Sequence, residues 1–333
     1  MGVRAGIIGL GVGEQHIEGY GRHPDCEVVA LCDFDERQLE ACRDRYPGLR
    51  TATDATEILT DPEIDVVSIA SYDNYHYEQA ATAIRHGKHV FVEKPLCLFE
   101  KEAADLRRAL AERPNLKLSS NLILRRSPRF RAVRDLMREG QLGEPYYLES
   151  DYNYGRLHKL TEGWRGALDF YSVVYGGGVH VVDLLLWLTG ERVVEVSSYG
   201  NRVASRGSQF QRDDFVVSLL KFESGKLGKI SANFGCVAPH FHTLVIYGTK
   251  ATFINDVESG KLITSRDPAQ AAREITVEYP GTHKGDLLYS FVDSIVKDTR
   301  GEVNADDVFE AMSVCFAIEK SLSRGRPVAV TPV

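Results

Sequence analysis

Short apolar runs alternate with amphipathic segments through the first third of the chain. The apolar runs, which we expect to be strands, are residues 3–10, 27–33, 65–71, 88–94 and 116–122. The segments between them, which we expect to contain helices, are residues 14–21, 35–46, 53–64, 76–87 and 99–113. Strict alternation of strand and helix predicts a doubly wound parallel sheet. Each helix returns the chain to the end of the sheet where the previous strand began, through a right-handed connection, so the next strand runs parallel to it.

After residue 121 the pattern changes to strands joined by hairpin-like turns. These strands are expected within residues 143–155, 193–203, 213–234, 242–256 and 273–281. Helices are expected at 128–139, 179–190, 284–298 and 305–323. Residues 122–333 are therefore predicted to form a second α/β domain with a large, open, mostly antiparallel sheet. Its C-terminal helices are candidates to pack back on the first domain.

Composition narrows the class of partner. The chain has 333 residues, a formal net charge of −7 and no lysine- or arginine-rich block, so no nucleic-acid partner is expected. Its six scattered cysteines form no C-x-x-C pair, which indicates reduced thiols and a cytoplasmic location. No apolar run approaches the ~20 residues of a membrane span, so no membrane partner is expected.

The turn after the first strand carries two glycines of a dinucleotide fingerprint. Gly9 allows the tight turn, and Gly11 lets the backbone approach a pyrophosphate at the helix N-terminus. The third glycine is displaced to Gly13, and Glu14 stands in its place, so that carboxylate has to point away from the phosphates. The expected cofactor-binding residues of this turn are Gly9, Leu10, Gly11, Val12 and Gly13.

An acid ends the second strand. Asp33 stands where a carboxylate bonds the adenosine ribose hydroxyls. It could instead cap the next helix, although Asp35 is also available for that cap. A carboxylate at position 33 repels a 2′-phosphate, which favours NAD over NADP.

The fourth strand ends in Glu93, Lys94 and Pro95. Ligands of an open parallel sheet sit beyond the carboxyl ends of its strands, where a lysine can stabilise developing negative charge on a substrate oxygen. The tripeptide alone is more typical of an ordinary surface lysine before a turn proline.

The order of motifs resembles the Gfo/Idh/MocA oxidoreductase family, named for glucose-fructose oxidoreductase and inositol dehydrogenase. The motifs are the G-x-G turn, the acid after the second strand, "GKHVFVEKPL" at 87–96 and a glycine-histidine-x-x-aspartate in the second half. The resemblance implies an NAD(P)-binding Rossmann domain at 1–121 and a substrate-binding and oligomerisation domain at 122–333. It further implies a homodimer or homotetramer built on the open sheet. The implied activity is hydride transfer between NAD(P) and a hydroxyl carbon of a sugar, cyclitol or related polyol.

The resemblance assigns roles around the cofactor. Lys94 matches the family's catalytic lysine, and Glu93 matches its partner near the nicotinamide ribose. The Lys94–Pro95 bond is expected to be cis. The family's Thr-Pro-Asn-x-x-His loop becomes Ser71, Tyr72, Asp73 and His76, of which Ser71, Tyr72 and His76 are expected cofactor contacts.

The second half carries the family's Asp-x-Gly-x-His-x-x-Asp motif with one departure. Gly178, His180 and Asp183 match, but Gly176 stands where the family has an acid that shares the proton work. His180 is then the expected base, since imidazole suits that role near neutrality. Asp183 is expected to orient the imidazole or bind substrate. A purely structural helix start is the alternative, and no third ligand accompanies the pair, so no metal is expected.

A polar and aromatic stretch precedes that motif. It offers a candidate substrate pocket, because aromatic faces pack on sugar rings and Arg or Lys binds a carboxylate or phosphate. The expected substrate-binding residues are Tyr154, Arg156, Lys159, Trp164, Arg165 and Asp183. The concentration of charge suggests a sugar acid or nucleotide sugar; a mobile surface loop is the alternative. His240 and His242 lie at a strand end that could reach the same site.

These observations predict an NAD-dependent dehydrogenase that acts on a secondary hydroxyl of a sugar, sugar acid, nucleotide sugar or cyclitol, with Lys94 and His180 handling the proton. Two other classes stay open. One is an NAD-binding regulatory or catalytically impaired family member, which Gly176 favours. The other is a redox-neutral, glycosidase-like enzyme that retains and recycles NAD.

Overall fold

The computed structural model describes residues 2–333 and divides the chain into two compact units. The first holds the chain up to Ile123, with His283–Phe309 and Val333; the second holds Leu124–Thr282 and Glu310–Pro332. Each unit is described by itself below. None of the helices found in residues 2–333 combines the length and the apolar character needed to cross a membrane.

The first unit is built on a six-stranded parallel sheet in the order β3-β2-β1-β4-β5-β6. Its strands are β1 Val3–Ile8, β2 Cys26–Cys32, β3 Arg50–Ala52, β4 Val66–Ile69, β5 His89–Val92 and β6 Leu118–Ser120. The doubly wound parallel sheet predicted from the alternating pattern is confirmed, with β3 as an additional edge strand. The strand order reverses between β1 and β4, and this switch point is where open α/β sheets bind ligands.

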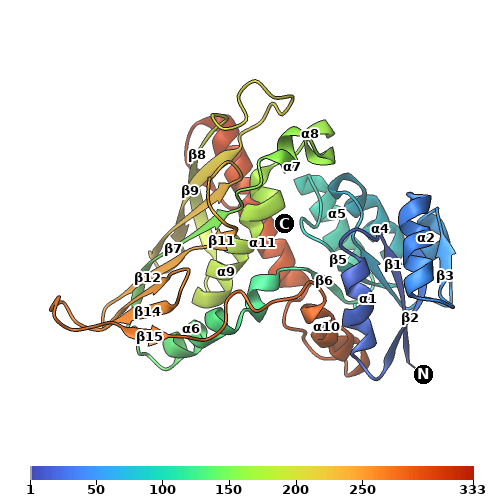
Figure 1. The fold of residues 1–333 in the computed structure, drawn as a ribbon, viewed down its shortest axis with the longest axis horizontal. Helices are drawn as coiled ribbons and strands as arrows, with labels where there is room; N and C mark the ends of the chain where they lie inside the picture. The colour runs from blue at the N-terminus through green and yellow to red at the C-terminus, as the bar shows by residue number, and fades with distance from the viewer. Residues whose placement is uncertain (1) are drawn as a thin grey trace. The chain divides into compact units, whose positions relative to one another are not determined.

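Helices connect these strands. They are α1 Glu14–Gly21, α2 Glu36–Arg45, α3 Thr56–Leu59, α4 His76–Arg85 and α5 Glu100–Ala111, joined by α10 Asp286–Val296 from later in the chain. Figure 1 shows α1 and α10 side by side. A Cβ on Gly19 would lie 2.7 Å from the Gly285 carbonyl oxygen, so glycine is what lets these two segments approach so closely.

The second unit is built on a large mixed sheet in the order β15-β14-β13-β12-β7-β10-β9-β8-β16, with β11 paired to β7. The strands that lie before residue 240 are β7 Pro145–Asn153, β8 Val193–Asn201, β9 Phe215–Phe222 and β10 Leu227–Asn233. The later ones are β11 Phe241–His242, β12 Leu244–Gly248, β13 Thr252–Asn255, β14 Gly260–Ile263, β15 Arg273–Ile275 and β16 Val328–Ala329. All neighbouring pairs are antiparallel except β7 with β10. The predicted mostly antiparallel sheet is confirmed.

One face of this sheet is covered by helices. Residues 148, 150 and 152 of β7 are buried and alternate with half-buried ones, the pattern of a strand with one covered face. The covering helices are α9 Val179–Thr189 and the C-terminal part of α11 Ala305–Arg324, as Figure 1 shows; α6 Pro128–Arg138 also belongs to this unit. Short helices α7 His158–Thr161 and α8 Trp164–Ala167 occupy the polar and aromatic stretch that precedes the glycine run.

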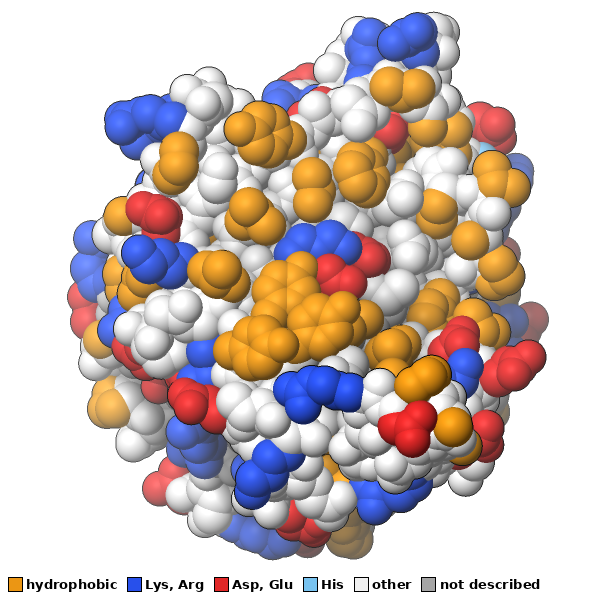
Figure 2. Space-filling model, turned by 90° about the vertical axis from the view of Figure 1, so that its left-hand side faces the viewer, with side chains coloured by type: hydrophobic (Ala, Val, Ile, Leu, Met, Phe, Trp, Pro, Cys, Tyr) orange, Lys and Arg blue, Asp and Glu red, His pale blue; other side chains and the backbone are white. Residues whose placement is uncertain are grey.

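The opposite face of the sheet is open. Leu219 and Leu227 are exposed on β9 and β10, and Tyr147 packs on Tyr247 with ring centroids 5.7 Å apart. Figure 2 shows hydrophobic side chains gathered on this side of the molecule, with charged side chains among them. Lys229 on β10 stands opposite Leu219 on β9 and contacts Asp151 at 2.6 Å.

Candidate functional site

The glycine turn after β1 is tightly constrained at two positions and open at one. Gly9 has φ +86°, and a Cβ there would lie 2.4 Å from the Ala70 carbonyl oxygen. A Cβ on Gly13 would lie 2.2 Å from the Gly9 carbonyl oxygen and 3.1 Å from both Ile7 and Ala70, so Gly13 supplies the close helix–strand packing of the displaced third glycine. A Cβ on Gly11 would meet nothing within 4 Å among the described residues. Gly11 thus leaves room for a ligand to approach the backbone.

Asp33 fixes this turn against the end of β2. Its carboxylate accepts hydrogen bonds from the Leu10 N–H at 2.7 Å and the Asp35 N–H at 2.9 Å. Asp35 caps α2 by accepting from the Arg37 N–H, so the cap and the strand-end acid are different residues. A carboxylate has further lone pairs, so Asp33 can still accept from ribose hydroxyls.

Glu14 points away from the turn, as expected, and pairs with Arg45 at 2.7 Å. The Glu14 carboxylate therefore adds no repulsion at the N-terminus of α1, where a phosphate would bind. In residues 2–333 no side chain caps that first turn, so its N–H groups suit an anion. Taken together, the turn, the helix start and Asp33 fit a dinucleotide.

The loop after β4 brings an aromatic ring toward Asp33. The ring of Tyr72 packs edge-on against exposed Phe34, which follows Asp33, with centroids 5.6 Å apart. Ser71 donates to Gln79 at 2.7 Å. His76 is fully buried, and its ring nitrogens lie 2.6 Å from the Pro95 carbonyl and 3.1 Å from the Ser71 carbonyl. His76 therefore ties this loop to the Lys94–Pro95 turn.

Glu93 is a buried carboxylate held by several partners that the sequence did not reveal. Asn121 donates to its Oε1 at 2.6 Å, and His16 Nε2 lies 3.4 Å from the same atom. His16 is itself anchored through Nδ1 to Ser68 at 2.7 Å. Burial raises the pKa of Glu93, but the positive charge of Lys284, the contact with His16 and the charge of Lys94 more than offset it, so the pKa is held well below its ordinary range. The carboxylate is therefore ionised near neutrality.

Lys94 follows Glu93 at the carboxyl end of β5 and is half-buried. The Lys94–Pro95 peptide bond is cis, as the resemblance led us to expect. The backbone N–H of Lys94 lies 3.3 Å from Glu93 Oε2.

The glycine run of the second unit forms a π-helical turn, Val174–Gly178, that leads into α9. A Cβ on Gly176 would lie 1.9 Å from the Tyr171 hydroxyl, and a Cβ on Gly177 would lie 2.3 Å from a ring carbon of Tyr152. The glycines of this run are buried, and they make room for two tyrosine rings.

His180 lies among aromatic side chains. It is buried on α9, and its ring stacks on that of Tyr152 with centroids 5.9 Å apart and an interplanar angle of 24°. The ring of Tyr152 also packs against those of Tyr154, His240 and His242, with centroids 5.1–5.5 Å apart. The two histidines that sequence reasoning placed near a strand end thus belong to one cluster with His180. Burial raises the pKa of the Tyr152 phenol above its ordinary range, so it stays neutral.

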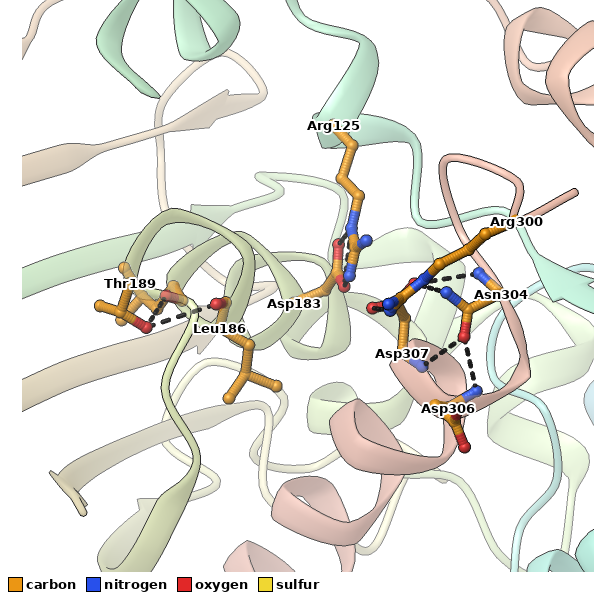
Figure 3. Close-up of polar contacts among 9 residues, drawn as sticks. Arg125, Asp183, Leu186, Thr189, Arg300, Asn304, Asp306 and Asp307 are labelled. Carbon is orange, nitrogen blue, oxygen red and sulfur yellow. Dashed lines mark hydrogen bonds and ion pairs between the residues drawn. The ribbon is translucent and has the colours of Figure 1, made fainter. Parts of the chain in front are cut away.

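Asp183 has a charged partner that the sequence did not suggest. The Arg125 guanidinium donates to both carboxylate oxygens of Asp183, through Nε at 3.0 and 3.1 Å and Nη2 at 2.6 Å. Figure 3 shows the two side chains pointing at one another. Asp183 is fully buried, and the Arg125 guanidinium supplies a compensating positive charge.

The stretch around α7 and α8 places its cations against aromatic rings. The Arg156 guanidinium lies 5.0 Å from the centroid of Tyr154, and the Arg165 guanidinium lies 4.6 Å from Trp164 and 5.9 Å from Tyr171. Lys159 is half-buried on α7. Arg165 is thereby placed near the glycine run, whereas Arg156 is exposed beside Tyr154.

Two family models match most of the chain. Residues 3–121 match a model described as an oxidoreductase family with an NAD-binding Rossmann fold, and residues 130–254 match the GFO/IDH/MocA C-terminal domain.

Relatives and solved structures align with two thirds or more of the chain. The myo-inositol 2-dehydrogenase of Thermotoga maritima is 25% identical, with 99% of each chain covered. The 1,5-anhydro-D-fructose reductase of Ensifer adhaerens is 27% identical, with 69% of each covered. The crystal structure of myo-inositol 2-dehydrogenase from Lactobacillus plantarum shares the fold with a TM-score of 0.85 and 21% identity, covering 99% of this chain and 100% of that one.

Proposed function

This chain belongs to the Gfo/Idh/MocA oxidoreductase family, and we propose that it transfers hydride between NAD and a secondary hydroxyl of a sugar, sugar acid, nucleotide sugar or cyclitol. The chain is an oxidoreductase with an NAD-binding Rossmann domain. The substrate class is supported by relatives named for inositol and anhydrofructose. The observation that carries the proposal is Asp33, held by two N–H groups at the end of β2 beside the open Gly11.

Bound NAD supplies the hydride acceptor at its nicotinamide ring. We assign the pyrophosphate to the backbone at Gly11 and the N-terminus of α1, and the adenosine ribose to Asp33. Phe34 and Tyr72 offer ring faces near that end of the cofactor. The charge of Asp33 opposes a 2′-phosphate, which supports NAD over NADP.

In this proposal, Lys94 and His180 handle the hydroxyl proton. His180 accepts it, and the Lys94 ammonium stabilises the negative charge that develops on the oxygen. The charge of Lys94 in turn helps to keep the neighbouring Glu93 carboxylate ionised, because it lowers the pKa of that group. Tyr154, Trp164 and the histidines around Tyr152 supply ring faces for a polyol, and Lys159 and Arg165 supply cations for an acidic substituent.

Spectroscopy of NADH tests the proposed reaction. The protein is incubated with NAD and a panel of cyclitols, sugars, sugar acids and nucleotide sugars, while NADH absorbance and product are followed together. Net NADH formation on at least one compound is expected. Product without change in NADH would favour a redox-neutral enzyme, and cofactor binding without turnover would favour a regulatory protein.

We also propose that the open face of the second unit's sheet binds a second copy of the chain, which gives a homodimer or homotetramer. Leu219 and Leu227 are 58% and 53% exposed there, and apolar side chains gather over neighbouring strands (Figure 2). The charged group of Lys229 and Asp151 on the same face would favour one register between copies, since two-fold symmetry brings each patch against itself. A cytoplasmic location fits the six cysteines, none of which forms a disulfide in residues 2–333.

A further inference from the structure

The Tyr171 hydroxyl occupies the space in which a side chain at position 176 would begin. A Cβ built on Gly176 lies 1.9 Å from the Tyr171 oxygen, 2.6 Å from Cζ and 3.3 Å from Cε2. Van der Waals contact requires nearly twice the shortest of these distances, so any side chain at position 176 would displace the phenol. Glycine at 176 and tyrosine at 171 are therefore coupled features of this chain.

The position of this hydroxyl relates it to His180. Residues 176 and 180 are four apart in one continuous helical segment, so their side-chain positions are neighbours on one face. A group that fills the side-chain position of 176 therefore lies on the helix face that carries His180. The Tyr152 ring meets the adjoining Gly177 and stacks on His180, so two phenols and the imidazole surround the start of α9.

The surroundings of Tyr171 suit a hydroxyl that donates a hydrogen bond to an oxygen with developing negative charge. Its side chain is 2% exposed, so water competes little for the hydroxyl. The Arg165 guanidinium lies 5.9 Å from the ring centroid, which adds positive potential at the phenol. A phenol keeps its proton near neutrality, so it donates a hydrogen bond where a carboxylate could only accept one.

We infer that Tyr171 is a further catalytic residue, whose hydroxyl donates a hydrogen bond to the substrate oxygen as its proton leaves. The inference rests on the proposed function. In that reaction the substrate O–H bond breaks and its proton passes to His180. Hydride leaves the carbon that bears this oxygen and passes to NAD, and the C=O bond forms. Tyr171 retains its own proton throughout. His180 is then the single base of the second unit, and the glycine at 176 exists because Tyr171 has taken that place.

A space-filling role for Tyr171 makes a different prediction. The ring packs edge-on against Phe210 and Phe234, with centroids 6.3 Å away in both cases, and phenylalanine would preserve those contacts. Tyr171→Phe removes only the hydroxyl. If the ring alone matters, this variant turns over as the wild type does.

The test compares Tyr171→Phe with wild type on whichever polyol the wild type oxidises. Loss of one donor to a developing oxyanion is expected to lower kcat by about 10²-fold. NADH affinity and the thermal unfolding midpoint should stay within error, and the acidic limb of the kcat/KM profile should still report one base. Tyr77→Phe is the matched control: it removes a phenol that donates to Asp105 at 3.3 Å in the first unit, and it should keep the wild-type kcat. A Tyr171→Phe enzyme with wild-type kcat and KM overturns the inference.

An exchange experiment provides the second measurement. Gly176→Asp alone should be impaired, because its Cβ collides with Tyr171, and Tyr171→Ala alone should be impaired by loss of the donor. Gly176→Asp combined with Tyr171→Ala should recover activity above both single variants, a strong departure from additivity. A double variant that folds and binds NADH but is no more active than Tyr171→Ala counts against the exchange.

The two levels of proposal fail separately. If the wild type oxidises no compound of the panel, the proposed function fails and the role of Tyr171 fails with it. If the wild type turns over and Tyr171→Phe is unaffected, only the role of Tyr171 is lost.

Discussion

Arg125 and Asp183 form a buried bidentate ion pair that joins the segment preceding α6 to the middle of α9. Their shortest contact is 2.6 Å, and the two side chains are 7% and 0% exposed. A carboxylate that is buried this completely requires a compensating charge, because desolvation of an unpaired ion costs several kcal/mol. The pair therefore determines how the helix that carries His180 is anchored within the second unit.

Removal of one partner is expected to destabilise the second unit strongly. Asp183→Ala leaves the Arg125 guanidinium buried without its anion, so the free energy of unfolding should fall by about 3–5 kcal/mol. Urea denaturation followed by fluorescence measures this change. Arg125→Met combined with Asp183→Leu should recover much of the loss, since both charges are then gone. If Asp183→Ala changes KM without changing stability, Asp183 is a substrate ligand rather than an anchor.

The Glu93 carboxylate is expected to stabilise the first unit only where it is ionised. Its pKa is depressed, so the unfolded state takes up the proton first as pH falls. The contribution is complete above the ordinary glutamate pKa of about 4.3, declines below it and is gone at the folded-state pKa. Wild type should therefore exceed Glu93→Gln in unfolding free energy at neutral pH, and the gap should close in strong acid. An unchanged gap across the acid range would mean that the shift is absent.

The role of the glycine turn in cofactor binding can be separated from its role in stability. Gly11→Val adds a side chain where the described structure has open space, so its unfolding midpoint should stay close to wild type. NADH affinity should fall by tenfold or more, equivalent to about 1.4 kcal/mol, because the side chain occupies the expected pyrophosphate position. Gly13→Ala is the comparison: its Cβ would lie 2.2 Å from the Gly9 carbonyl, so it should lower the midpoint. Fluorescence titration and thermal melts measure the two effects, and a Gly11→Val protein with wild-type NADH affinity would place the cofactor elsewhere.

The local pattern of apolar and polar residues was sufficient to predict the alternating strands and helices of this fold, but not its short edge strand. Alternation identified five strands of the first sheet, whereas β3, with three residues and one buried side chain, carries too little apolar periodicity to be recognised. The identity of the site's partners depends on contacts between residues distant in sequence. Nothing local to Asp183 indicates Arg125, which is 58 residues away, and nothing in the glycine run indicates that the rings of Tyr171 and Tyr152 fill its space.

Cofactor choice should depend on the charge at position 33. Asp33→Asn keeps an oxygen that can accept one of the two N–H groups but removes the negative charge that opposes a 2′-phosphate. The ratio of NADP to NAD dissociation constants should fall by tenfold or more, about 1.4 kcal/mol, with a stability loss of about 1 kcal/mol from the weakened hydrogen bonds. Asp35→Asn is the matched control, since asparagine also caps helices and the position is exposed. Equal changes in the ratio for both variants would show that general surface charge, not Asp33, sets the preference.

Assembly should depend on the open face of the second sheet. Leu219→Lys places a charge at the centre of an apolar strand face, opposite Lys229 on β10, so two like charges face each other across the strands. Copies that associate through this face should dissociate, and light scattering coupled to gel filtration should report a smaller species. Val237→Lys adds the same charge at a fully exposed position after β10 and should leave the assembly intact. If Leu219→Lys keeps the wild-type mass while Val237→Lys changes it, the copies meet through another surface. The open face belongs to the sheet of the second unit and the glycine turn belongs to the first, so Leu219→Lys should bind NADH with wild-type affinity even as a monomer.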